Sequence, residues 1–285
     1  MKIVSSTPRL VVCAALWSME GQPRPRRPWS LATKLRLIKE AGFDGIAEMF
    51  QPVLAPHLRR HSLRICGRLF SRDGRETESL LKIEAAGGAS YVNCMLGEHD
   101  TTPAVATRLI IRTVRQARVL GLSAHLETHR DTCTESPEKL AEIARRYESE
   151  TGELLPVTWD HSHLAVSKHL LPAEYSRRLL DQPELIQHSR LFHCRPFNGQ
   201  HAQVPVTNGH GKLTPEFLEY LTFVEDLFVL WLRGPSPRGE LWICPELGTT
   251  GGYHVSTNPP VWLDTVRCRT ELIKAWFRAL RRAKR

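Results

Sequence analysis

The stretch VTWDHSHLAV, residues 157–166, runs through apolar, β-branched residues into Asp160, His161 and His163, and then becomes apolar again. The apolar run is typical of a buried strand. A carboxylate and two imidazoles are costly to bury without partners. Their position at the end of the run therefore predicts that they meet other polar groups there.

The same pattern, a short apolar run followed by a helical pattern, repeats along the whole chain. We expect strands at residues 10–17, 45–50, 62–70, 90–97, 122–129 and 154–166, within 182–197, and at 240–248. We expect helices at residues 30–43, 77–88, 103–121, 137–152 and 215–234, because apolar residues recur there at helical spacing. Strands that alternate with helices predict a parallel sheet. Eight such units predict an α/β fold of the (β/α)8 TIM barrel type, as a single domain over residues 1–285.

The cysteines and the apolar runs bear on the compartment. The seven cysteines are scattered singly without a CxxC pair, which favours reduced thiols in a cytoplasmic protein over a disulfide framework. The run LVVCAALW at 10–17 follows Lys2 and Arg9, as in a signal peptide, but no clear cleavage site follows it, so we interpret it as the first strand. No run approaches the roughly 18 apolar residues of a membrane span, so we expect no membrane partner.

Much of the formal net charge of +9 lies in the segment 271–285. We interpret its bases as the solvated face of an amphipathic helix, with a nucleic-acid surface as the alternative. A second basic stretch, GQPRPRRPW at 21–29, is expected to form a loop over the barrel mouth. Its arginines fit a phosphorylated or carboxylated substrate, and they fit surface solubility equally well.

Polar side chains close four successive strands of the expected barrel. The active site of such a barrel lies at the C-terminal ends of its strands. Three of the closing residues are carboxylates, which repel one another when buried unless a cation neutralises them. The sequence therefore predicts one divalent metal ion, Mn²⁺, Mg²⁺ or Co²⁺ with Zn²⁺ as an alternative, because the donor set is rich in oxygen and lacks thiolate. The predicted donors are Glu127, Asp160, His193 and Glu246.

Four short motifs on these strands resemble the xylose isomerase-like barrel superfamily of sugar isomerases and epimerases. They are LETH at 126–129, DHSH at 160–163, HCR at 193–195 and PELG at 245–248. The resemblance covers nearly the whole chain and depends on the four motifs together, since no single one is specific.

The resemblance implies a metal-dependent isomerase or epimerase that acts on a sugar or sugar acid through an enediolate. It implies that Glu127 and Glu246 are both metal ligands and the catalytic pair that moves protons. It implies that His163 and Arg195 bind the substrate. The sequence leaves the metal, the stereocentre and a homo-oligomeric state open.

Each candidate residue also has a purely structural explanation. Glu127 could form a salt bridge with Arg130, and Asp160 could cap a turn. His193 could be a core histidine, and Glu246 could be a loop residue. Arg195 could bridge carboxylates instead of contacting a substrate.

Several further side chains have two interpretations. His161 could replace His163 at the site, because neighbours alternate sides along an extended chain. Trp17 and Trp159 could pack against a sugar or serve in the core. Four other residues could line the pocket or lie elsewhere, namely Glu48, His99, His129 and Arg130.

The connection 195–212 is long and rich in Gly, Asn and His, so we expect it to cover or build the site. His201 and His210 on it favour a rival, the apurinic-site endonucleases, which share this barrel and bind three zinc ions. The Asp that such a site needs beside His201 is missing, and the run 62–70 ends without His. We therefore expect a site for one metal ion and no nucleic-acid partner. A dehydratase and a non-catalytic sugar-binding barrel stay as alternatives.

Overall fold

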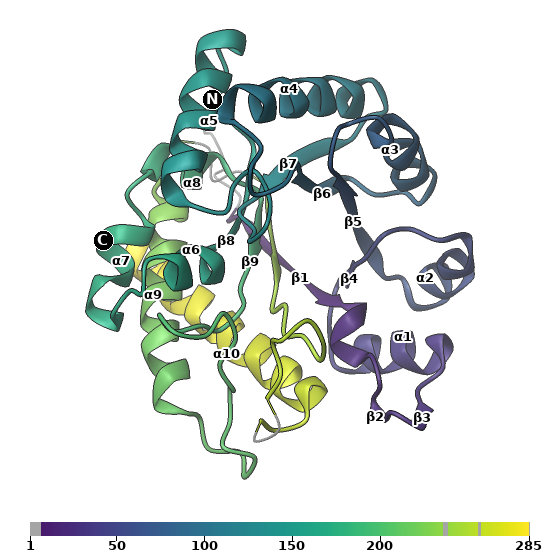
Figure 1. The fold of residues 1–285 in the computed structure, drawn as a ribbon. Coiled ribbons are helices and arrows are strands. Elements are labelled where there is room, and N and C mark those ends of the chain that lie inside the picture. The colour runs from purple at the N-terminus through teal and green to yellow at the C-terminus, as the bar shows by residue number, and fades with distance from the viewer. Residues whose placement is uncertain (1–6, 236–238, 256–257, 285) are drawn as a thin grey trace, which may run out of the picture.

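The structure is a computed structural model that describes residues 7–235, 239–255 and 258–284. Within these ranges, eight parallel strands close into a barrel: β1 (Arg9–Ala15), β4 (Gly45–Ala47), β5 (Arg64–Ser71), β6 (Tyr91–Leu96), β7 (Ser123–Glu127), β8 (Val157–Asp160), β9 (Leu191–His193) and β10 (Glu240–Cys244). Each strand pairs with the next along the chain, and β10 pairs with β1 to close the ring. Figure 1 shows the helices outside this ring. The (β/α)8 barrel expected from the sequence is confirmed.

The helices that cover the barrel are α1 (Leu31–Glu40), α2 (Ala55–His61), α3 (Thr77–Ala86), α4 (Pro103–Val119), α5 (Pro137–Thr151), α6 (His161–Ser167), α7 (Tyr175–Leu179), α8 (Pro183–His188), α9 (Pro215–Leu232) and α10 (Val261–Ala283). Short elements complete the fold: the 3-10 turns η1 (Leu16–Met19), η2 (Pro52–Leu54) and η3 (Pro172–Glu174), and a hairpin of β2 (Pro23–Arg24) and β3 (Arg27–Pro28). Four helices, α1, α4, α5 and α9, begin where a hydroxyl side chain accepts a hydrogen bond from a backbone N–H in the first turn, at Ser30, Thr102, Ser136 and Thr214.

The apolar core has two layers that alternate along the strands. On β1, Val12 and Ala14 belong to the layer between strands and helices, while Val11 and Cys13 face the other side. Successive side chains of a strand point to opposite faces, so this second set fills the barrel interior. Trp242 is its largest member. The polar residues at the strand ends lie beyond this packed interior, at the mouth of the barrel.

The segment 154–166 differs from the expectation of one extended run. Strand β8 ends at Asp160, and α6 begins at the next residue, because the Asp160 side chain accepts a hydrogen bond from the backbone N–H of Ser162 and so caps the helix. Alternation along an extended chain therefore does not decide between His161 and His163. In the helix, residues three apart lie on one face, which places His163 beside Asp160.

Other expectations have mixed outcomes. The run 10–17 forms β1 and then turns into η1, and residues 1–6, which include Lys2, lie outside the described residues. The helix expected over 271–285 is part of α10, of which residue 285 is not described. All seven cysteines are free and buried. Among the described residues, the helices are all too short or too polar to cross a membrane.

Candidate metal centre

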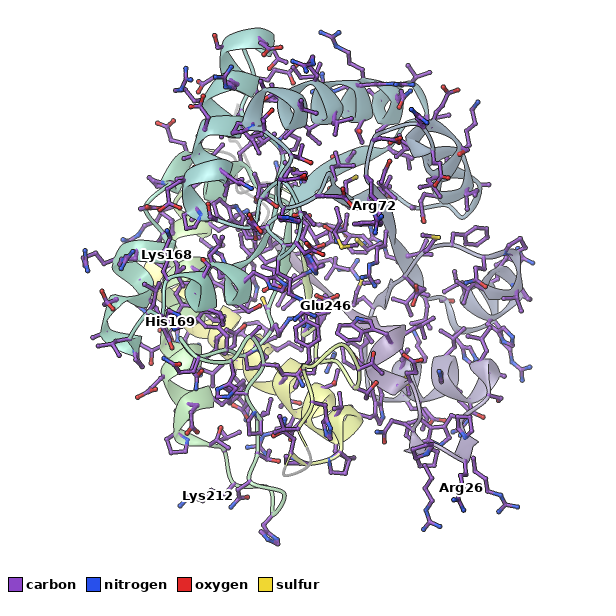
Figure 2. All side chains as sticks on the ribbon, in the orientation of Figure 1. Arg26, Arg72, Lys168, His169, Lys212 and Glu246 are labelled. Carbon is purple, nitrogen blue, oxygen red and sulfur yellow. The ribbon has the colours of Figure 1, made fainter. Side chains whose placement is uncertain are left out.

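Four buried side chains from successive strands converge at the mouth of the barrel. Glu127, Asp160 and His193 are the last residues of β7, β8 and β9, and Glu246 follows β10 by two residues. One donor atom from each lies within 4.8 Å of the others. The parallel register pairs Asp160 with His193, which sets the strand ends level. Figure 2 shows Glu246 near the middle of the ring, whereas Arg26 and Lys212 lie at the periphery.

His193 lies between two carboxylates. Its Nδ1 is 2.9 Å from Oε1 of Glu127 and 2.9 Å from Oε2 of Glu246. Burial alone would lower the pKa of His193, but the negative charges of Glu246 and Glu127 outweigh it and raise this pKa well above its ordinary value. The same contacts lower the pKa of Glu127 and, with Arg195, that of Glu246, against the opposing effect of burial. Both carboxyl groups are therefore ionised.

Arg195 bridges the other two carboxylates. Its Nη2 lies 2.7 Å from Oε2 of Glu246 and 3.1 Å from Oδ2 of Asp160. The guanidinium is 4.1 Å from the centre of the Tyr253 ring and 5.6 Å from that of Trp17. Its Nη1 is buried and has no hydrogen-bond partner among the described residues. The structural alternative for Arg195, a bridge between carboxylates, is thus what the geometry shows, while one N–H edge of the guanidinium stays available.

Each carboxylate has its second oxygen held from outside the centre. Asn93 Nδ2 donates to Oε2 of Glu127, and the backbone N–H of Ser162 donates to Oδ1 of Asp160 at 3.0 Å. Trp17 Nε1 donates to Oε1 of Glu246 at 3.3 Å. Outer hydrogen bonds of this kind fix the orientation of ligands in metal sites.

Sequence reasoning missed Asn93 and Ser162 as parts of the site. The signal for Asn93 was a lone amide inside the apolar run YVNCML of β6. Ser162 was visible only as the middle of DHSH, and its role depends on the helix that starts there. Trp17 was considered as a sugar platform or a core residue, and not as a hydrogen-bond donor to Glu246. It approaches so closely that a Cβ on Gly248 would lie 1.9 Å from its ring, so only glycine fits at that position.

The donor set fits one divalent ion. Two ligands at right angles, each about 2.1 Å from an octahedral ion, lie about 3.0 Å apart. The two distances of 2.9 Å from His193 to the glutamates are hydrogen-bond distances, and they are also short enough for the three side chains to share one ion. The three carboxylates supply oxygen, and the imidazole supplies one nitrogen, which is a donor set that Mg²⁺, Mn²⁺, Co²⁺ and Zn²⁺ all accept.

His163 stands beside the centre. Its Nε2 lies 3.5 Å from Oδ2 of Asp160 and makes no hydrogen bond within the described residues. Burial, with the nearby His129 and Arg195, lowers the pKa of His163 well below its ordinary value, so the ring is neutral. The His129 ring lies 4.4 Å from that of His163. His161 is turned away and stacks on Trp159, 5.2 Å between ring centres.

A pocket of about 670 Å³ opens next to His163 and Tyr253. Its walls come from α6, from residues 198–205 of the long connection, and from the segment after β10. The long connection therefore builds this pocket, as expected. The lining mixes polar and aliphatic side chains, among them Arg130, Asn198, His201, Glu216, Val166 and Val204.

Other candidate residues lie elsewhere or have structural partners. His99 is exposed and pairs with Asp131, 3.3 Å away. Arg130 does not contact Glu127; it donates to the backbone oxygen of Gly251 and lies 4.5 Å from the Tyr253 ring centre. Burial raises the pKa of Glu48, whose carboxylate accepts from the backbone N–H of Met49. Among the described residues, His, Cys, Asp and Glu side chains form one cluster able to hold a metal, and His201 and His210 are not in it.

Comparison with known proteins confirms the fold. The sequence matches no protein-family model and no curated protein. Among solved structures, it is similar to a xylose isomerase-like TIM barrel protein from Mycobacterium smegmatis in complex with magnesium, at 14% identity and a TM-score of 0.56, covering 93% of this chain and 97% of that one. It is also similar to an L-ribulose 3-epimerase, at 12% identity and a TM-score of 0.60, covering 96% of each chain.

A third similar structure is the 3-keto-D-glucoside 4-epimerase of E. coli, at 15% identity and a TM-score of 0.57, covering 93% of this chain and 100% of that one. The chain therefore has the TIM barrel fold of these proteins, one of which is described as xylose isomerase-like. At these identities the likeness establishes the fold, and the chemistry must be argued from the residues.

Proposed function

We propose that the chain is a divalent-metal-dependent isomerase or epimerase of a sugar or sugar-derived hydroxy-carbonyl compound. The observation that carries the proposal is the convergence of three ionisable oxygen donors and one imidazole, all buried, within 4.8 Å at the ends of neighbouring strands. Similar solved structures support it, because they include a ribulose 3-epimerase and a barrel in complex with magnesium.

Glu127, Asp160, His193 and Glu246 would hold the ion. When bound, it supplies fixed positive charge that polarises a carbonyl oxygen and stabilises the negative charge that develops there. Without such charge, a carbon acid beside a ketone does not ionise at neutral pH.

The chain's own residues account for proton movement. Glu127 and Glu246 contact His193 Nδ1 from two different strands, β7 and the end of β10. One carboxylate can take a proton from the carbon beside the carbonyl, and the other, after taking up a proton from water, can return it from another side. The first carboxyl group then gives its proton back to water. Return to the opposite face of the same carbon gives epimerisation, and return to the neighbouring carbon gives isomerisation.

His163 and Arg195 are suited to hold substrate oxygens. Nε2 of His163 and Nη1 of Arg195 are both buried polar atoms that lack a hydrogen-bond partner among the described residues. An unpaired buried polar group is costly, so each is expected to meet a polar ligand group. The pocket beside His163 gives the rest of the substrate a place.

Deuterium exchange tests the proposal directly. Protein stripped with a chelator is reloaded with Mn²⁺, Mg²⁺, Co²⁺ or Zn²⁺ and incubated with ketoses and sugar acids in D₂O. We expect metal-dependent deuterium uptake at the carbon beside the carbonyl, and its loss in E127Q and E246Q. Net loss of water from the substrate would indicate a dehydratase, incision of abasic DNA an endonuclease, and saturable binding without exchange a binding protein; each would contradict the proposal.

A further inference from the structure

Arg195 places a permanent positive charge inside the cluster of acids. Its side chain is 1% exposed, and it contacts carboxylate oxygens of both Asp160 and Glu246. A guanidinium keeps its charge in proteins at all ordinary pH values. The rings of Tyr253 and Trp17 lie against the guanidinium. The Arg195 side chain therefore cannot turn toward solvent unless these two rings also move.

The charges of the centre can be counted from these contacts. At their formal charges the three acidic side chains of the cluster contribute three negative charges, and Arg195, which contacts two of them, offsets one. An imidazole that binds a metal does so in its neutral form. Two negative charges are therefore left for an ion to neutralise. Buried charge that stays uncompensated is strongly unfavourable.

We infer that Arg195 is a fixed internal cation that sets the charge of the ion the centre accepts, so that a divalent ion and not a trivalent one completes the neutralisation. This inference rests on the proposed function, since it requires that the cluster holds a metal. It assigns Arg195 a role toward the ion that is separate from any contact of its Nη1 with a substrate.

The chain offers a matched control. Arg130 also lies against the Tyr253 ring, with its guanidinium carbon 4.5 Å from the ring centre. Arg130 is exposed, however, and its Nη2 donates a hydrogen bond to the backbone oxygen of Gly251. Water and salt screen an exposed charge, so loss of Arg130 removes an arginine from the same aromatic ring without changing the charge of the buried cluster.

The experiment compares Tb³⁺ with Mg²⁺. Trp17 donates a hydrogen bond to Glu246, so it lies close enough to the centre to sensitise terbium emission, and displacement by Mg²⁺ then gives both affinities. In R195M we expect the ratio of Tb³⁺ affinity to Mg²⁺ affinity to rise by at least about tenfold, because the extra charge of Tb³⁺ no longer meets a buried cation. R195K keeps the charge and is expected to keep the wild-type ratio, as is R130M.

Stability without any ion gives an independent readout. In chelator, R195M is expected to melt several degrees below R130M, because it leaves three buried acids with no arginine. The double variant R195M/D160N removes one charge of each sign. We expect it to recover much of the melting temperature that R195M loses, and to return the affinity ratio toward that of the wild type. Should R195M not fold, the effect of removing the arginine is measured instead between D160N and R195M/D160N.

The outcomes separate this inference from the proposed function. An affinity ratio that is unchanged in R195M, or that changes equally in R130M or R195K, overturns the inference. If the wild type then still shows metal-dependent deuterium exchange, the proposed function stands. A wild type that binds neither Tb³⁺ nor Mg²⁺ overturns both.

Discussion

Asn93 Nδ2 donates a hydrogen bond to Oε2 of Glu127, and the partner oxygen of the same carboxylate faces His193. The amide thus decides which oxygen of Glu127 points into the centre. We predict that N93L, which has the same branched shape and no donor, lowers divalent-ion affinity by about tenfold or more, the usual cost of losing an outer partner of a metal ligand. Calorimetric titration with Mg²⁺ measures this, and circular dichroism checks the fold. Wild-type affinity in a folded N93L would show that Glu127 does not need the amide.

Gly248 and Trp17 form a second coupled pair. A Cβ at position 248 would lie 1.9 Å from the Trp17 ring, so G248A must displace the ring that donates to Glu246. We predict a fall in the free energy of unfolding of about 1–3 kcal/mol from overpacking, together with weaker ion binding. In W17L the added methyl has room, so G248A should cost much less in that background. Equal costs in both backgrounds, in a double-mutant cycle measured by urea denaturation, would show that the clash is not with Trp17.

Val166 on α6 lines the pocket beside His163, and its aliphatic side chain is not part of the predicted metal centre. We predict that V166W raises the KM for the accepted sugar by about tenfold or more, because the larger ring fills space that the ligand needs. Mg²⁺ affinity should be unaffected. Leu171→Trp, at a position with 66% exposure that is not among the lining residues, is the matched control. An unchanged KM in V166W would remove the pocket from the substrate path.

Glu84 on α3 predicts a pH dependence of stability away from the centre. Burial raises the pKa of its carboxyl to about 7 from 4.5, despite hydrogen bonds from the backbone N–H groups of Phe50 and Arg68. The folded state therefore holds a proton that the unfolded state releases, so the stabilisation is complete below pH 4.5 and is lost as the pH rises through 7.

We predict that E84Q, which cannot ionise, is more stable than the wild type at pH 8 by about 3 kcal/mol and similar to it at pH 4.5. Urea denaturation at the two pH values measures the difference. Glu78→Gln, an exposed residue of the same helix that pairs with Lys82, should show no such gain at pH 8. A difference between E84Q and the wild type that is the same at both pH values would contradict the assignment to ionisation.

The fold and the convergence of four polar side chains could be predicted because both depend on local patterns. A polar residue that follows an apolar run marks a strand end, and parallel strands bring their ends to one mouth, so Glu127, Asp160, His193 and Glu246 could be found without coordinates. The orientation of His163 could not, because it depends on the strand ending at Asp160 and on the helix that starts there.

Contacts between neighbouring strands could not be predicted from the sequence either. Asn93 meets Glu127 only because of the lateral pairing of β6 and β7, and a linear pattern carries no register between them. For Arg195, the sequence left a choice between a substrate and neighbouring carboxylates. That choice depends on where each nitrogen of the guanidinium points. In the structure Nη2 bridges Asp160 and Glu246, while Nη1 has no hydrogen-bond partner among the described residues.

The chain passes from β8 into α6 without an intervening residue. An insertion of one residue at this junction would turn every later side chain of the helix by about 100° around its axis and carry His163 away from Asp160. This corner of the mouth therefore does not tolerate a change in length. Diversification toward new ligands would fall instead to the long connection after β9, where residues can be added without moving any of the four donors.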